Sequence, residues 1–99
     1  MRNAYEANIM GKTVPIINIP FFQSEVAAEL ALTADYAAAY YFDGEAYKFS
    51  LRSKEGGDDV SLIAAKFGGG GHKNASGFLI KNLSQLSVGD ENDNKRENE

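Results

Sequence analysis

The sequence contains no cysteine and only one histidine. Without cysteine the chain forms no disulfide and supplies no thiolate ligand, which fits a reducing compartment such as the cytoplasm. No apolar run approaches the roughly 18 to 20 residues that a transmembrane helix requires. Residues 1–12 also lack the continuous apolar centre of a signal peptide. We therefore expect a cytoplasmic chain with no membrane segment.

The length of 99 residues and the hydrophobic content of 43% predict one small folded domain. The net charge of −4 arises mainly from residues 89–99, which carry five acidic and two basic side chains and no apolar one. We expect these residues to form a disordered acidic tail. The remaining nine acidic and eight basic side chains nearly balance, so any anion must bind at a local cluster of cations.

The remainder of the chain divides into residues 1–13 and residues 14–88. The first segment is polar and mixed, and is interpreted as a linker or the end of an upstream helix. The second is interpreted as the domain itself. It opens with an apolar, β-branched run, Val14 to Ile19, that predicts a buried strand. Apolar residues at helical spacing then follow Ser24, which we expect to cap that helix.

A β-hairpin is predicted from Tyr36–Phe42 and Glu45–Ser53, joined by a two-residue turn at Asp43-Gly44. In this register Tyr40 lies opposite Tyr47. One face of the hairpin then carries large apolar residues: Tyr36, Tyr40, Phe49 and Leu51. The other face carries mostly small or polar residues and ends in an arginine, so it suits either a covering helix or a ligand.

A second helix, Val60 to Phe67, is predicted from the spacing of its apolar residues and from Asp59 as its N-cap. The run GGGGH, residues 68–72, and a strand from Ala75 to Ile80 follow it, and one helical turn is expected at Leu83–Leu86. The predicted fold is therefore α/β, with a small mixed sheet, about two packed helices and a helix–GGGGH loop–strand element.

The four consecutive glycines exceed what a helix C-cap requires. Glycine lets the backbone approach a bound group closely, and successive N–H groups can converge on an anion. Because the run follows the end of a helix, it is not a P-loop, which would begin one. The positive charge must then come from side chains, and His72, Lys73 and Arg52 are available. The alternative is a flexible linker between helix and strand.

The segments FSLRS, DVSLIAAKFGGGGH and ASGF resemble the DHH-associated C-terminal domain of DHH-family phosphoesterases. That family includes oligoribonucleases, single-strand exonucleases, cyclic-dinucleotide phosphodiesterases and proteins once labelled exopolyphosphatases. The resemblance implies a site that binds the phosphate or terminal nucleotide of the substrate. The residues implied are Arg52, Gly69, Gly70, Gly71 and His72, with Ser53, Asn74 and Ser76 as neighbours.

The sequence departs from the family in having no Asp-His-His motif, which in its members helps to hold two manganese ions in a separate N-terminal domain. The chain is therefore expected to be inactive alone and to hold no cofactor. Mn²⁺ would belong to a catalytic domain that lies upstream or in another chain. The expected ligands are a short oligonucleotide, a nucleotide or another phosphate ester, and a second copy of the chain is a further partner considered. The alternatives are a stand-alone nucleic-acid-binding module and an inert structural or dimerisation domain.

Overall fold

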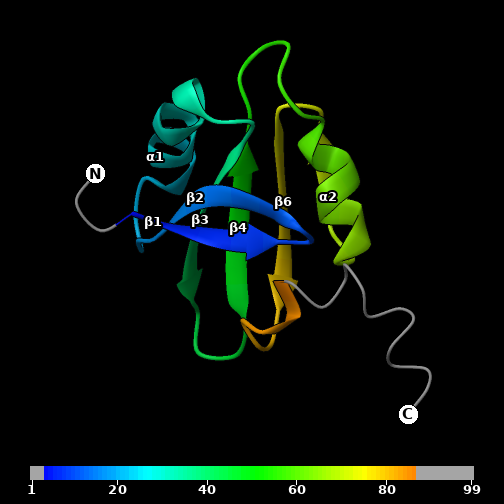
Figure 1. Cartoon of the computed structure of the whole chain (residues 1–99). Coiled ribbons are helices and arrows are strands. Elements are labelled where there is room, and N and C mark those ends of the chain that lie inside the picture. The colour runs from blue at the N-terminus through cyan, green and yellow to red at the C-terminus, as the bar shows by residue number, and fades with distance from the viewer. Residues whose placement is uncertain (1–3, 87–99) are drawn as a thin grey trace.

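A computed structural model describes residues 4–86, which form a mixed α/β fold (Figure 1). The six strands form one sheet in the order β1-β2-β3-β4-β6-β5, with β2 and β3 parallel and the other pairs antiparallel. This confirms the predicted fold class. The elements are β1 (Tyr5–Ile9), β2 (Lys12–Asn18), α1 (Gln23–Leu30), a 3-10 turn (Ala31–Thr33), β3 (Ala37–Phe42), β4 (Tyr47–Arg52), α2 (Val60–Lys66), β5 (Gly70–His72) and β6 (Ala75–Ile80). The acidic segment 89–99 lies outside the described residues.

The N-terminal segment corrects one expectation, because Tyr5–Ile9 is a strand and not a linker or a helix end. It pairs with β2 through a tight turn in which Met10 and Gly11 both have positive φ. Ile9 is buried whereas Tyr5 and Glu6 are exposed. The apolar signal of an edge strand with one covered face is weak, which explains why the sequence pattern did not identify it.

The main core lies between one face of the sheet, helix α2 and the β1–β2 hairpin, which crosses in front of the other strands in Figure 1. Three aromatic rings from three neighbouring strands stack across this face, with Tyr40–Phe49 and Phe49–Phe78 centroids 4.8 and 4.9 Å apart. Phe67, which follows α2, stacks on Phe78 at 4.4 Å. The apolar side chains predicted for one face of the hairpin therefore do form the core.

The β3–β4 hairpin has a longer loop than predicted. Tyr40 lies opposite Phe49 and not opposite Tyr47, so Asp43 to Ala46 form a four-residue connection. The carboxylate of Asp43 explains this length, because it accepts hydrogen bonds from the backbone N–H groups of Glu45 and Ala46, each at 2.9 Å. The register shift of two residues leaves every side chain on the face to which it was assigned.

The second face of the sheet is covered by α1 only in part. Ala27 of α1 packs with Ile17 and Ala39 in a small second core, and α1 contacts β2, β3 and β4, whereas α2 packs on the opposite face against β4, β5 and β6. Ser24 does not cap α1, because the N-cap is Phe22, in a left-handed conformation and without a side-chain cap. Asp59 caps α2 as predicted, accepting from the N–H of Ser61. Beyond α1, this second face is open.

Candidate functional site

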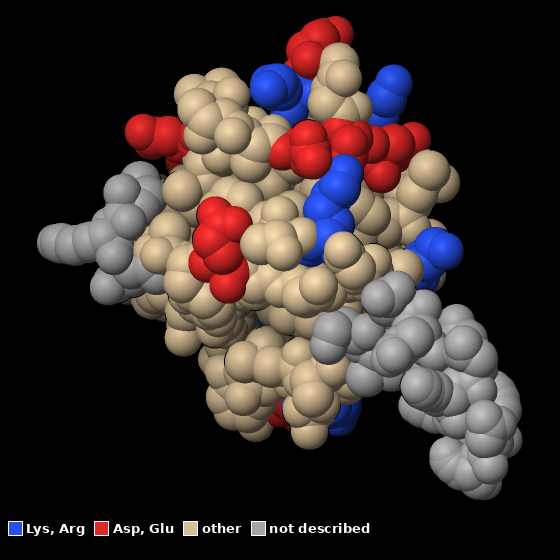
Figure 2. Space-filling view, in the orientation of Figure 1, with Lys and Arg blue, Asp and Glu red and all other residues tan. Residues whose placement is uncertain are grey.

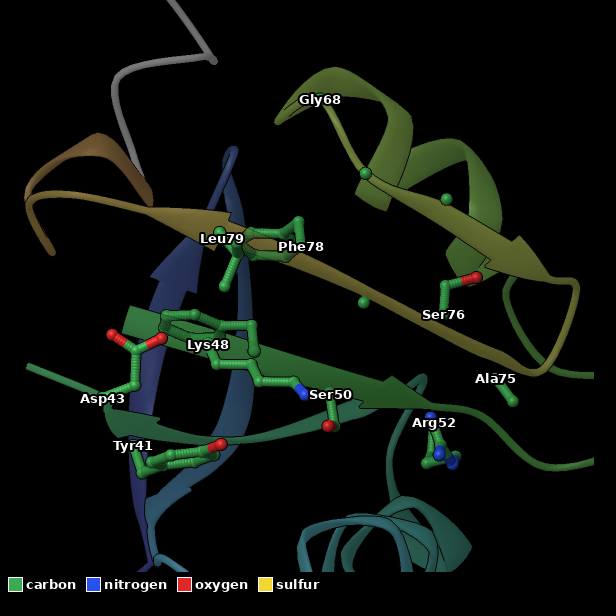
Figure 3. A pocket seen from close by; sticks show the side chains of 14 residues that line it. Tyr41, Asp43, Lys48, Ser50, Arg52, Gly68, Ala75, Ser76, Phe78 and Leu79 are labelled. Carbon is green, nitrogen blue, oxygen red and sulfur yellow. The ribbon is translucent and has the colours of Figure 1, made fainter. Parts of the chain in front are cut away.

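An open hollow of about 700 Å³ occupies the part of the sheet that α1 leaves uncovered (Figure 3). The strand register builds its floor in rows, because partners across neighbouring strands project to the same face. One row joins Arg52 with Ala75 and His72, and the next joins Ser50, Gly77 and Gly70. The lining residues are Tyr41, Asp43, Lys48, Phe49, Ser50, Arg52, Gly68, Gly69, Gly70, Ala75, Ser76, Gly77, Phe78 and Leu79.

Arg52 is held in place at one end of the hollow. Its Nη1 donates to the carbonyl oxygen of Leu51 at 2.7 Å, and its Nη2 donates to the hydroxyl oxygen of Ser24 at 2.6 Å. Because the guanidinium has five N–H groups, donors remain for a ligand. Burial lowers the pKa of Arg52 and the charge of Glu25 opposes that shift, but a guanidinium stays protonated at neutral pH. The site therefore offers a pre-oriented, half-buried cation.

The glycine run is not a flexible linker, because its last part is the edge strand β5. Gly68 has a φ of 88° and ends α2, and the N–H of Gly69 bonds to the carbonyl of Ala64 at 2.9 Å. A Cβ at Gly69 would collide with the backbone of Gly77 and lie 2.7 Å from the Cβ of Phe78. The fold therefore requires glycine at both positions.

The next two positions of the run differ sharply. Gly71 has a φ of 148°, and a Cβ there would lie 2.6 Å from the carbonyl oxygen of Ala75. A Cβ at Gly70, in contrast, would meet nothing within 4 Å. Gly70 lines the hollow, so a side chain at this position would enter space that is otherwise open to a ligand. It is the one glycine of the four that neither backbone conformation nor packing requires.

His72 is exposed on the edge strand, in the same row as Arg52. Two strand spacings separate their backbones, roughly 10 Å, so both side chains can reach a ligand between them. Its carbonyl oxygen accepts a hydrogen bond from the hydroxyl of Ser76 at 2.7 Å, which ties the β5–β6 turn together. His72 therefore lies on the edge strand in register with Arg52 but is not one of the residues that line the hollow, and Ser76 is buried.

Ser53 and Asn74 were expected beside the ligand, and in the structure their polar groups bond to each other and to the backbone. The hydroxyl of Ser53 donates to the carbonyl of Asp58 at 2.6 Å and accepts from the amide of Asn74 at 2.7 Å. The same amide nitrogen also donates to the carbonyl of Lys54 at 3.1 Å. These contacts join the loop before α2 to the turn before β6, so both residues act here as supports for the site.

Sequence reasoning did not include several lining residues among the site residues, although the alternation of β4 places Lys48 and Ser50 on the same face as Arg52. Tyr41 and Leu79 occupy the same row as Lys48. In Figure 3 the Lys48 side chain extends along β4 toward Ser50, so its ammonium group points to the half of the hollow that holds Arg52. Alternation along the hairpin is sufficient to place Tyr41 and Lys48 on this face, but the position of Leu79 depends on the β4–β6 register.

On the face seen in Figure 2 the charges are mixed and form no broad positive area, and most of the Lys, Arg, Asp and Glu side chains visible there gather at one end. Lys12, which contacts Asp35 and Asp58 at 3.1 Å each, illustrates this balance. Within residues 4–86, no group of three or more His, Asp or Glu side chains is placed to hold a metal ion. None of the helices described is long and apolar enough to cross a membrane.

Comparison with known proteins finds similar sequences in proteins that are much longer than this chain. The chain is 38% identical over 72 residues to an uncharacterised protein of Acanthamoeba polyphaga mimivirus, a match that covers 67% of this chain and 17% of that protein. It is 44% identical over 61 residues to the bifunctional oligoribonuclease and PAP phosphatase NrnA of Mycoplasma genitalium, which covers 59% of this chain and 19% of that protein. The chain thus spans about a fifth of the length of these relatives.

A solved structure and a family model agree with these matches. The crystal structure of an uncharacterised protein from Helicobacter pylori G27 has a TM-score of 0.54 at 28% identity, covering 76% of this chain and 22% of that one. The family model described as the DHHA1 domain matches residues 23–92, which include both helices and the whole glycine run. Since this match covers more than half of the sequence, the chain belongs to the DHHA1 domain family, the DHH-associated C-terminal domain that its motifs predicted.

Proposed function

We propose that this domain binds the phosphate or terminal nucleotide of a short nucleic acid, a nucleotide or another phosphate ester, and presents it to a DHH catalytic domain. The observation that carries the proposal is the open space beside Gly70. Gly70 lines the hollow without being needed by the fold, and the same hollow is lined by a guanidinium that Ser24 holds in position. A ligand that approaches the backbone closely supplies the missing reason for glycine at this position.

The chemistry of binding follows from the residues that surround the open space. A phosphate above β6, between β4 and β5, would take charged hydrogen bonds from Arg52 and a further hydrogen bond from His72 on the edge strand. The Lys48 ammonium would add a second cation from the other side. Backbone approach at Gly70 and Gly77 would let a bulky ester lie flat on the sheet.

We propose that the chain alone does not hydrolyse its ligand. The described residues offer cations and backbone groups but no set of carboxylate and imidazole ligands for two divalent ions. The Mn²⁺ ions and the reaction would then belong to the catalytic partner. The similarity to NrnA of Mycoplasma genitalium, which is named as an oligoribonuclease and PAP phosphatase, supports the proposal that this domain works as part of a phosphoesterase.

Isothermal titration of the chain with 5′-AMP tests the binding proposal. Arg52→Ala removes a charged contact, and we expect it to weaken binding by about 1.5 to 3 kcal/mol, or roughly 10- to 150-fold. The matched control is Lys66→Ala, because Lys66 is an exposed cation of α2 on the opposite face of the sheet. Equal affinities of the parent and Arg52→Ala would contradict the proposal.

The same titration separates the alternatives. Binding that grows with oligonucleotide length and falls steeply with salt would indicate a general nucleic-acid-binding module. Absence of binding by any phosphate ester would favour a structural or dimerisation domain. Release of phosphate by the purified chain with Mn²⁺, if lost in His72→Ala, would contradict the assignment of catalysis to a partner.

A further inference from the structure

The edge strand β5 carries the one histidine of the sequence, yet none of its residues is buried. Its residues are Gly70, Gly71 and His72, and all three are exposed. Glycine loses more conformational freedom on folding than any other residue, so ordering four consecutive glycines is costly. Apolar packing does not hold this strand, and the position of the His72 imidazole therefore depends on hydrogen bonds.

The turn that follows β5 is joined through its backbone to two other elements. The carbonyl oxygen of Lys73 accepts a hydrogen bond at 2.8 Å from the N–H of Val60, the first residue of α2. The carbonyl oxygen of Asn74 accepts one at 3.2 Å from the N–H of Ser53, which directly follows β4. These two bonds are made by the backbone and do not depend on which side chains the turn carries.

The side chain of Asn74 makes the connection that does depend on residue identity. Its Nδ2 donates to the hydroxyl oxygen of Ser53 at 2.7 Å and to the carbonyl oxygen of Lys54 at 3.1 Å. These acceptors belong to the two residues that follow Arg52, and Asn74 lies two residues after His72. In Figure 3 the turn before β6 lies at the same end of the sheet as Arg52. One amide group therefore joins the segment that carries the guanidinium to the segment that carries the imidazole.

We propose that Asn74 is a positioning residue, which holds the His72 imidazole within reach of a phosphate at Arg52. The inference rests on the proposed function and assigns a new role within that site. Asn74 acts through His72 and not on the ligand, because both N–H groups of its amide have acceptors within the protein. Without this amide, backbone contacts and the Ser76 hydroxyl alone would hold β5, and a short glycine-rich edge strand would open locally.

A double-mutant cycle measured by calorimetric titration with 5′-AMP tests this role. His72→Ala and Asn74→Ala should each weaken binding about 2- to 12-fold, the range that one hydrogen bond supplies. The double variant should bind no more weakly than His72→Ala alone, because Asn74 has nothing left to position. A structural effect of Asn74 that did not pass through His72 would instead add to the effect of His72→Ala.

The imidazole ring provides a second measurement, because a chain with one histidine gives one unambiguous set of ring signals. Saturating 5′-AMP should shift the ring ¹H–¹³C signals of the parent, and the shift should be smaller in Asn74→Ala. The matched control is Asn82→Ala. Asn82 also holds a turn through its side chain, by accepting from the N–H and hydroxyl of Ser84, but at the other end of β6. This variant should keep the affinity and the ring shift of the parent.

Circular dichroism establishes that each variant is folded. Should Asn74→Ala not fold, Ser53→Ala takes its place in the cycle, because it removes the acceptor of the 2.7 Å bond. Additive losses, an unchanged ring shift, or equal affinities of His72→Ala and the parent would overturn the inference while Arg52→Ala still weakens binding. Failure of Arg52→Ala to weaken binding would instead overturn the proposed function.

Discussion

Exchanging Gly69 and Gly70 separately for alanine tests the division of the glycine run between fold and function. At Gly69 the added methyl group would lie 2.7 Å from the Cβ of Phe78 and against the backbone of Gly77, so β5 must move away from β6. Overpacking of this kind costs about 1 to 3 kcal/mol. In a domain of this size each kcal/mol lowers the melting temperature by about 4–8 °C.

At Gly70 the expected change has the opposite sign. The added methyl group meets nothing within 4 Å and the position lies in a strand, so alanine chiefly restricts the unfolded chain and stabilises by about 0.4 to 1 kcal/mol. The melting temperature should then rise by about 2–8 °C. Thermal unfolding followed by circular dichroism measures both variants. Equal losses of stability at Gly69→Ala and Gly70→Ala would refute the claim that the fold needs only one of these two glycines.

Three further outcomes are expected. Ser24→Ala, which removes a hydrogen bond to the Arg52 guanidinium, should weaken 5′-AMP binding roughly 2- to 10-fold with little change in melting temperature; equal calorimetric affinities would contradict that positioning role. Gly70→Val should fold like the parent but bind 5′-AMP at least 10-fold more weakly, because its side chain enters the hollow, and parental affinity would contradict this. Hydrogen bonds from Ser61 hold the pKa of Asp59 below its ordinary 3.8, so its stabilisation is present above that pH and is lost as the pH falls through the lower folded-state pKa. The melting temperature of the parent should therefore exceed that of Asp59→Asn at pH 7, and the difference should shrink as the pH falls below 3.8; a constant difference would contradict the role of the charge.

Local signals in the sequence predicted much of the fold. The spacing of apolar residues and Asp59 located α2, and alternation along Tyr36–Phe42 and the following strand assigned side chains to the correct faces. These features depend on residues close together in the chain. The exact hairpin register depended on the backbone N–H groups from which the Asp43 carboxylate accepts hydrogen bonds. A two-residue loop and a four-residue loop both keep the same side chains on the same face, so alternation along the strands does not distinguish them.

The site was predicted less completely than the fold. The motif drew attention to Arg52 and the glycine run, but it did not distinguish Gly70 from its neighbours, because the contacts of Gly69 and Gly71 arise only once β5 pairs with β6. Leu79 becomes part of the hollow only through the β4–β6 register. Ser53 was expected at the ligand, and only the fold shows that its hydroxyl bonds to the protein.

Binding of a phosphate ester at the open face of the sheet is the central claim, and a titration of the ¹⁵N-labelled chain with 5′-AMP followed by amide chemical shifts tests it most directly. We expect the largest shift changes at the amides of Arg52, Gly70 and Gly77, and little change at the exposed residues of α2 on the opposite face. Saturating changes confined to α2, or no changes at millimolar 5′-AMP, would contradict the claim.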